Sequence, residues 1–331
     1  MILPTPPGAA AGDQRGFVLP AVLAAVAVLA LVAAMVGDWL VDSLGRTTAM
    51  QARLEADARL HGTRQLVAWL MVTSPYTPGG LQALPTAPAV ALDGRPFQDG
   101  PVLLSLLDGS GQYNLNTMDD QGLGELLRQA GVPLDRRAEM IAALLDYLAP
   151  PSPAAGPGML DDASRQAGLP PPRHQPLQTP WELRRVLSWS DPSLPAGLLT
   201  VVAASQVQGV NVNTAGLPVL LTLPGMTASM AEKLIATRSR RALAGSADVA
   251  AATGAAEPPD PLRVHTLPAG TLCLTMTAPG EPLARVVSLT LSPAGRNPIR
   301  VDYDVLLPAS EVTTPPPPGE AVGPLRAPTG R

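Results

Sequence analysis

Cysteine, histidine and aromatic residues are scarce in this chain of 331 residues. Its one cysteine, Cys273, cannot form a disulfide within the chain, so the sequence neither requires nor excludes an oxidising compartment. One cysteine and three histidines are also too few for most structural zinc sites. Charged residues make up only 15%, and the net charge is −4. Because proteins that coat nucleic acid normally carry a basic excess, this balance argues against that class.

Signatures of catalysis are missing as well. The histidines His61, His174 and His265 lie far apart in the sequence, and no nucleophile elbow, HExxH motif or phosphate-binding loop occurs. The acidic pairs at 119–120 and 161–162 are predicted to lie at helix starts or turns rather than to act as an acid and a base. We therefore expect a protein that is not an enzyme and has no resident cofactor.

Small and branched apolar residues are abundant instead. Hydrophobic residues reach 46%, and 39 prolines and 30 glycines indicate long irregular connections. Residues 17–37 carry no charge and would form a helix of roughly 31 Å, which matches the hydrocarbon core of a bilayer. Pro20 falls in the first turn, where its missing N–H does no harm. We expect a membrane helix that starts at Phe17, includes Met35 and ends before Asp38.

This apolar segment has three interpretations. A cleaved secretory signal peptide could use the small residues at 32–34, although its apolar core is normally shorter. An uncleaved signal anchor is the second interpretation. The third rests on Arg15, Gly16 and Phe17, where a short polar leader (residues 1–16) ends in glycine directly before the apolar helix. This arrangement resembles the processing site of type IV pilins and pseudopilins, where a prepilin peptidase cuts after the glycine and methylates the new N-terminus. We favour the third interpretation.

Helical periodicity continues past the membrane segment. No proline occurs between 38 and 72, and apolar residues keep a loose helical spacing. Residues 17–72 are predicted to form one helix of roughly 80 Å. Most pilin-like subunits carry glutamate at the fifth position after processing, where it neutralises the buried terminal amine of a neighbour. Ala21 occupies that position here, which indicates a subunit with nothing beyond it in a filament.

The rest of the chain mixes strand and loop patterns. Alternating apolar residues predict strands at 102–107, 271–277, 284–291 and 300–306, of which the middle two form a β-hairpin. Residues 74–101 are predicted to be loop with one short strand, and 149–180 and 242–261 to be irregular connections. The proline-rich tail after Pro308 is predicted to be disordered.

Two related units occupy the middle of the chain. Each begins with an Asn-x-Asn-Thr motif, at 114–117 and at 211–214. A helical hairpin follows each motif, with predicted helices at 122–129 and 135–147 in the first unit and at 217–222 and 228–238 in the second. The second Asn and the Thr of each motif are expected to cap the next helix. A further helix is predicted at 180–189, with Thr179 and Glu182 forming a capping box.

These features together resemble the minor pseudopilin K family of the type II (general) secretion system. The resemblance covers residues 15–306, and its most specific parts are 111–117, 210–215, 223–225, 231–235 and 181–183. It implies an α+β fold, in which a pilin-like domain with a long N-terminal helix and an antiparallel sheet is interrupted by a mostly helical insertion. The implied divisions are the leader (1–16), the membrane part of the helix (17–37), the first part of the pilin-like domain (38–113), the insertion (114–241), the C-terminal strands (242–307) and the tail (308–331).

The same resemblance implies a location, partners and a function. The chain would cross the bacterial inner membrane once and hold its C-terminal domain in the periplasm. It would join minor pseudopilins I and J, other pseudopilins and the inner-membrane assembly platform, help to start the pseudopilus and so support export of folded proteins across the outer membrane. The alternative is a membrane-anchored helix-hairpin-helix DNA-binding protein of the competence type.

A calcium site is one finer possibility, because some family members bind calcium in the loop after the first helical hairpin. The matching residues are Asp146, Asp161 and Asp162, and Ala149 stands where members often carry an acid. Calcium takes six to eight oxygen ligands, several of them from carboxylates. We therefore favour solvated loop acids over a calcium site.

A DNA site is the other possibility. Helix-hairpin-helix modules bind a phosphate through backbone N–H groups of a Gly-x-Gly hairpin. The second hairpin has Gly225 but Thr227 in place of the second glycine, and the basic residues near it include Lys233 and Arg238. Pro133 removes a donor from the first hairpin. We therefore favour protein contacts over nucleic-acid binding.

Overall fold

The computed structural model describes residues 18–86, 88–117, 119–150, 160–190, 196–255, 260, 262–292, 294–312 and 323–325. It divides into two compact units, Met1–Ala58 and Arg59–Arg331, which we describe separately. The predicted leader, with Gly16 and Phe17 at the cleavage site, lies outside the described residues, as does most of the predicted disordered tail. Residues 309–312 of that tail form a helix and 323–324 a strand, so the prediction of disorder was wrong for these residues.

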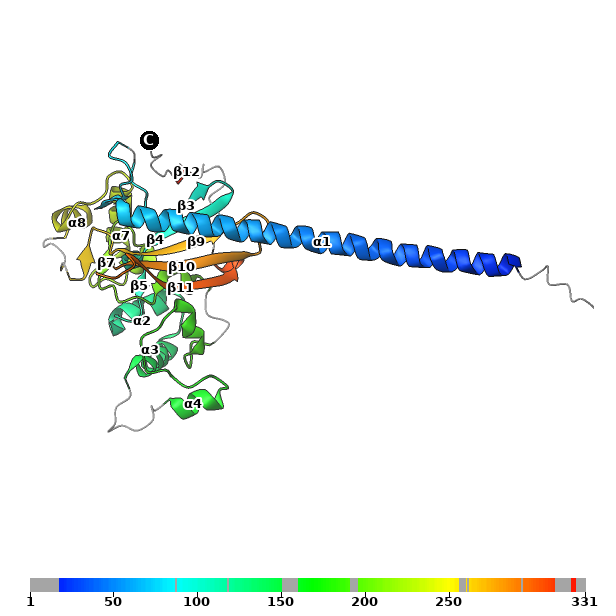
Figure 1. The fold of residues 1–331 in the computed structure, drawn as a ribbon. Coiled ribbons are helices and arrows are strands. Elements are labelled where there is room, and N and C mark those ends of the chain that lie inside the picture. The colour runs from blue at the N-terminus through cyan, green and yellow to red at the C-terminus, as the bar shows by residue number, and fades with distance from the viewer. Residues whose placement is uncertain are drawn as a thin grey trace, which may run out of the picture. The chain divides into compact units, whose positions relative to one another are not determined.

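The first helix, α1, runs without interruption from Val18 to Thr73. Figure 1 shows it in blue to cyan. This confirms the predicted long helix over its described part. Pro20 lies in its first turn, where no intrahelical N–H bond is lost. In the first unit nearly all its side chains are exposed, whereas Leu60, Val67 and Leu70 are buried in the second unit.

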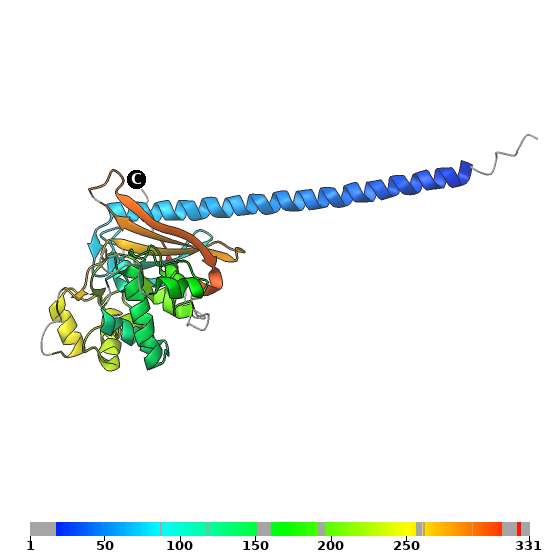
Figure 2. The same ribbon diagram turned by 90° about the horizontal axis from the view of Figure 1, so that it is seen from below.

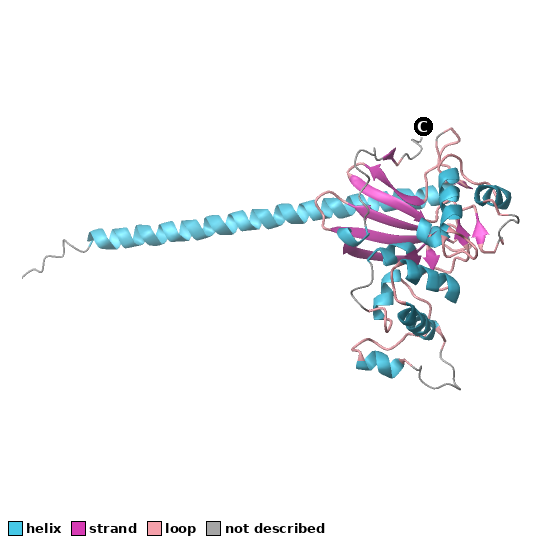
Figure 3. Cartoon of the chain, turned by 180° about the vertical axis from the view of Figure 1, so that it is seen from behind, coloured by secondary structure: helices cyan, strands magenta, loops and turns pink. Residues whose placement is uncertain are grey.

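A six-stranded sheet forms the centre of the second unit (Figures 1 and 3). Its order is β11 (Ile299–Pro308), β10 (Leu283–Leu291), β9 (Thr271–Thr277), β4 (Val102–Asp108), β3 (Asp93–Asp99) and β12 (Gly323–Pro324). Neighbours are antiparallel, except that β12 runs parallel to β3. All four predicted strands are confirmed. β3 was not specifically predicted, because Asp93, Gly94 and Pro96 break the apolar alternation that marks a strand.

The two faces of this sheet have different partners. Figure 2 shows the last turns of α1 along one face and the helical insertion on the other. Strand β4 alternates accordingly, with Val102, Leu104 and Leu106 fully buried and the residues between them less so. Polar contacts also join helix to sheet, since Thr63 donates to Asp99 at 2.7 Å and Arg64 pairs with Asp304 at 2.8 Å.

The insertion between β4 and β9 is mostly helical. Its elements are η2 (Gly109–Gly111), β5 (Tyr113–Asn114), α2 (Asp120–Gln129), α3 (Leu134–Leu148), α4 (Asp161–Gln166), η3 (Pro180–Arg185), α5 (Ala196–Val201), β6 (Val202–Ala203), β7 (Val210–Asn211), α6 (Leu217–Leu220), α7 (Ala228–Arg238), α8 (Ser246–Thr253) and β8 (Val264–His265). One hydrophobic core, which includes Leu123, Leu144, Leu183, Leu220 and Leu234, holds these elements together. Outside the insertion lie β1 (Tyr76–Thr77), β2 (Gly80–Leu81) and α9 (Ala309–Val312).

Several local predictions were wrong. The connections at 149–180 and 242–261 contain α4 and α8. The predicted helix at 180–189 is a 3-10 helix that ends at Arg185, because Val186 is extended (φ −83°, ψ 135°). Thr179 makes no side-chain cap there, so the predicted capping box does not form.

The predicted Asn and Thr caps of the two hairpins were also wrong. Asp119 caps α2, accepting a hydrogen bond from the Gly122 N–H at 2.6 Å. The described residues show no side-chain cap on α6, which begins after Gly216. The Asn side chains of both motifs instead bind groups that are distant in the sequence.

Candidate functional site

The first unit presents an apolar helix. α1 is long and apolar enough to cross a membrane, and among the described residues it is the one helix that meets this test. Leu19 and Met35 are 70% and 65% exposed, and Ala21 also lies on the open surface of the helix. So much unpartnered apolar surface is unstable in water and fits a lipid environment or packing against other helices. The helix therefore has the properties of a membrane anchor.

The first Asn-x-Asn-Thr motif, at 114–117, holds three segments of the insertion together. Asn114 Oδ1 accepts from the N–H of Asn116, and its amide donates to Ser205 Oγ and to the Val207 carbonyl. Asn116 pairs with the backbone of Leu177 in both directions, accepting from its N–H at 2.8 Å and donating to its carbonyl at 3.0 Å. An Asn side chain that donates and accepts in this way makes the same pair of hydrogen bonds with the backbone that a residue of a neighbouring β-strand would make. The motif thus fixes the chain that precedes η3.

The second Asn-x-Asn-Thr motif, at 211–214, repeats this arrangement. Asn211 Oδ1 accepts from the N–H of Asn213 at 3.0 Å. Asn213 accepts from the N–H of Leu243 at 2.9 Å and donates to the carbonyls of Leu243 and Thr266. Leu243 precedes α8 as Leu177 precedes η3, and both leucines are buried. The two asparagines therefore make equivalent contacts in both helical repeats of the insertion.

The likeness of the two helical repeats extends beyond their motifs. The residue after each leucine donates its N–H to an acid four residues further on: Gln178 to Glu182 and Ala244 to Asp248, both at 2.8 Å. Each helical repeat also begins and ends with short strands that pair in parallel, β5 with β6 and β7 with β8. Since β8 pairs with β7 and the Thr266 carbonyl binds Asn213, the second helical repeat continues past residue 241 to about residue 266. The insertion is thus built from two copies of one structural module.

Asp108 joins the sheet to the second module. This residue is fully buried at the end of β4. Its Oδ2 accepts from Ser110 at 2.5 Å, Asn211 at 2.8 Å and Thr214 at 3.1 Å, and its Oδ1 accepts from the Ala269 N–H. Four donors compensate the burial of a carboxylate, which is otherwise costly. This one carboxylate therefore links the end of β4 to the second helical repeat and to the chain before β9.

The three candidate calcium ligands do not converge. Asp161 lies 3.3 Å from His174 Nε2, and Asp162 pairs with Arg165 on the surface. Asp146 Oδ2 is buried without a hydrogen-bond partner, while the carbonyls of Asp146 and Ala149 face His174 Nδ1. No group of three or more His, Cys, Asp or Glu side chains suited to a metal occurs among the described residues, which omit 151–159. The arrangement gives no support to the calcium site that the resemblance raised as a possibility, and the preferred interpretation of these residues as loop acids has not been tested.

The candidate nucleic-acid residues do not form one surface. Gly225 forms the hairpin turn with φ +75°, and Lys233 is exposed on α7. Arg238 turns inward and donates Nη1 to the Val212 carbonyl at 2.5 Å. Burial lowers the pKa of Arg238, and nearby Asp93 partly offsets this. A basic group used in this way inside the fold is poorly placed for a phosphate backbone.

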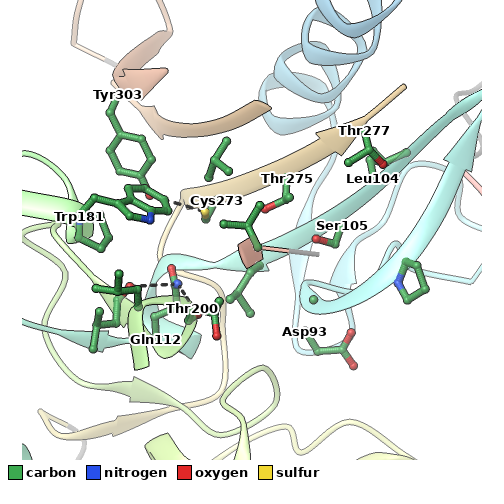
Figure 4. Close-up of a pocket in the computed structure, with 18 of the residues that line it drawn as sticks. Asp93, Leu104, Ser105, Gln112, Trp181, Thr200, Cys273, Thr275, Thr277 and Tyr303 are labelled. Atoms are coloured by element: carbon green, nitrogen blue, oxygen red, sulfur yellow. Dashed lines mark hydrogen bonds between the residues drawn. The ribbon is translucent and has the colours of Figure 1, made fainter. Parts of the chain in front are cut away.

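A cavity of about 260 Å³ opens where the first module meets the sheet (Figure 4). Trp181 of η3 meets Tyr303 of β11 edge to face, with ring centres 5.9 Å apart. Cys273 lies 3.6 Å from the Tyr303 hydroxyl, and burial raises the pKa of its thiol. The sequence carries no motif for this cavity, because its lining comes from segments far apart in the chain. Its polar groups include hydroxyls and one amide, and Gln112 uses that amide to bind the Thr200 and Val202 carbonyls.

Comparison with known proteins identifies the fold. No family model matches the sequence, and neither does any curated protein. Four solved chains are structurally similar. One is a chain in the crystal structure of the GspK–GspI–GspJ complex from the type 2 secretion system of enterotoxigenic Escherichia coli. It is 17% identical with a TM-score of 0.55, and the match covers 79% of the present chain and 99% of that one. The chain therefore has a pilin-like α+β fold, like that seen in pseudopilins.

Proposed function

We propose that this chain is a minor pseudopilin of a type II secretion system and that it occupies the tip of the pseudopilus. The observation that carries the proposal is the coincidence of three features in one chain: the apolar anchor helix, the pilin-like sheet and an inserted pair of helical modules. The structural match covers 79% of the present chain as well as 99% of a chain from a complex of that system, so it is not confined to the sheet.

The proposed partners follow from that complex. Its name describes three proteins, GspK, GspI and GspJ, and we propose that the present chain assembles with its own counterparts of GspI and GspJ. Other pseudopilins, the inner-membrane assembly platform and a prepilin peptidase complete the set. The chain would pass once through the bacterial inner membrane, with its C-terminal domain in the periplasm.

The proposed mechanism is mechanical rather than catalytic. The apolar part of α1 holds the subunit in lipid until the platform draws it into the growing filament. Helices that leave lipid need equivalent packing from neighbouring helices. Gly16 and Phe17 would define the cleavage and methylation site, and Ala21 would suit a subunit with no neighbour above it. The folded second unit would form the end that meets exported proteins or the outer-membrane channel.

A secretion assay tests this proposal. Deleting the gene in its own bacterium should leave the folded substrates of the type II system in the periplasm and remove them from the medium. Expression of the wild-type chain should restore export, whereas a Gly16→Asp variant, which blocks processing, should not. Unchanged export in the deletion strain would contradict the proposed function.

The alternative, a membrane-anchored DNA-binding protein, is not favoured because Arg238 is turned into the fold. A gel-shift titration distinguishes the two. We expect no salt-sensitive binding of duplex DNA below micromolar concentrations. Tight binding lost in the Lys233→Ala variant would favour the alternative.

A further inference from the structure

A single tryptophan marks the point where the anchor helix loses its apolar character. Residues 18–37 of α1 carry no ionisable side chain, and Asp38 and Trp39 follow directly. Trp39 is 68% exposed and is the one aromatic residue among the described residues of the first unit. A large apolar ring with an N–H donor is poorly suited to open water and equally to the hydrocarbon core.

The spacing along the helix matches the thickness of a bilayer. Val18 and Trp39 are separated by about 31 Å at 1.5 Å per residue. The hydrocarbon core is about 30 Å thick, and tryptophan is enriched where that core meets the headgroups. If the first turn of α1 lies at one boundary of the core, Trp39 therefore reaches the other.

The residues after Trp39 fit the headgroup layer. Asp42 and Arg46 follow at three and seven residues, so they lie on the same side of the helix as the indole. They pair at 3.0 Å and remain 72% and 81% exposed. Such a pair contributes little in water, but it offers charges of both signs to lipid headgroups.

We infer that Trp39 binds the glycerol and carbonyl layer at the outer boundary of the bilayer and sets the depth at which α1 is held before extraction. This inference rests on the proposed anchoring of α1. It adds a lipid-contact residue to the anchor and predicts that the helix from Asp42 to Ala58 lies outside the hydrocarbon core.

Depth-dependent fluorescence quenching tests the inference. The full-length protein is reconstituted into phosphatidylcholine vesicles that carry bromine either near the carbonyl end or near the end of the acyl chains. The contribution of Trp39 is the difference between wild-type and Trp39→Phe protein. We expect shallow bromine to quench this difference about twofold more strongly than deep bromine. A Trp69→Phe variant, altered in the second unit, should leave the pattern unchanged.

A reporter at mid-membrane separates the two possible failures. In a Val28→Trp variant the added indole should be quenched most by deep bromine. Deep quenching at position 28 without preferential shallow quenching of Trp39 would overturn the inference and leave the anchor intact. Absence of deep quenching at position 28 would overturn both the anchoring and the inference.

Discussion

At the residue scale, the amides of the Asn-x-Asn-Thr motifs decide how the insertion is built. Asn116 and Asn213 each bind a buried leucine backbone in both directions, at 2.8 to 3.0 Å. The sequence showed the motifs and their repetition, but it predicted helix caps. The reason is that Asn is a good cap whenever a helix follows, and the competing partners Leu177 and Leu243 lie 61 and 30 residues away along the chain.

The role of Asn213 can be measured directly. An Asn213→Ala substitution removes three hydrogen bonds and leaves the Leu243 N–H and the Thr266 carbonyl without this partner. Unsatisfied buried groups cost roughly 1–3 kcal/mol each, so we expect a loss of at least about 2 kcal/mol in the free energy of unfolding. Urea unfolding of the detergent-solubilised protein measures it. Asn297→Ala, on an exposed loop, is the control and should change stability by less than about 0.5 kcal/mol.

His265 in β8 should make stability depend on pH. Burial lowers its pKa below the ordinary 6.5, and Asp108 opposes this only in part. The unfolded chain therefore binds a proton at a higher pH than the folded chain does. The neutral His265 side chain makes its full contribution to the free energy of unfolding above pH 6.5. This contribution is lost as the pH falls from 6.5 toward the lower pKa of the folded state, by at most about 1.4 kcal/mol per pH unit.

Urea unfolding at pH 7.5 and pH 5.5 checks this dependence. The wild-type protein should lose more stability between these two values than a His265→Asn variant does. The two proteins differ only at residue 265, so contributions from all other groups cancel in the comparison. Equal losses in the two proteins would show that His265 is not coupled to folding.

At the element scale, regular patterns were predictable and irregular ones were not. The long helix and the four strands with alternating apolar residues were found from periodicity alone. β3 was not specifically located, because Asp93, Gly94 and Pro96 interrupt the apolar alternation that marks a strand. Pro96 is tolerated because β12 pairs with β3 only at Phe97 and Gln98. α8 was missed because its sequence is rich in small residues and resembles a linker. In the structure Val249 is buried, and Asp248 accepts a hydrogen bond from the Ala244 N–H.

The connection between α1 and β3 depends on one glycine. Gly80 has φ +122°, and a Cβ at this position would lie 2.0 Å from the Val90 carbonyl oxygen. Leu81, next to it, is fully buried and exchanges backbone hydrogen bonds with Val90. We expect Gly80→Ala to lower the free energy of unfolding by roughly 3 kcal/mol or more.

Gly131→Ala is a matched control for Gly80→Ala. Gly131 also has positive φ, at +78°, but a Cβ there would meet no atom within 4 Å. The control should lose only about 1 kcal/mol, from backbone strain alone. Comparable losses in the two variants, measured by urea unfolding, would show that the close approach to Val90 is not what makes Gly80 necessary.

At the scale of the whole molecule, the candidate site was only partly predictable. The anchor helix could be located from composition, because a run of about 20 uncharged apolar residues is typical of a helix that spans a membrane. The duplication was visible in part, but the full length of the second module was not, since it depends on the pairing of β7 with β8 across more than 50 residues. The cavity beside Trp181 was invisible, because its lining is assembled only by the fold.

We propose that this is a pilin-like subunit whose mature chain begins with its membrane helix. The most direct test is the intact mass and N-terminal sequence of the protein purified from its own bacterial membranes. We predict a chain that starts at Phe17 and carries one methyl group on its terminal amine. A mature protein that starts at Met1, or one cut within or after the apolar segment, would contradict the claim.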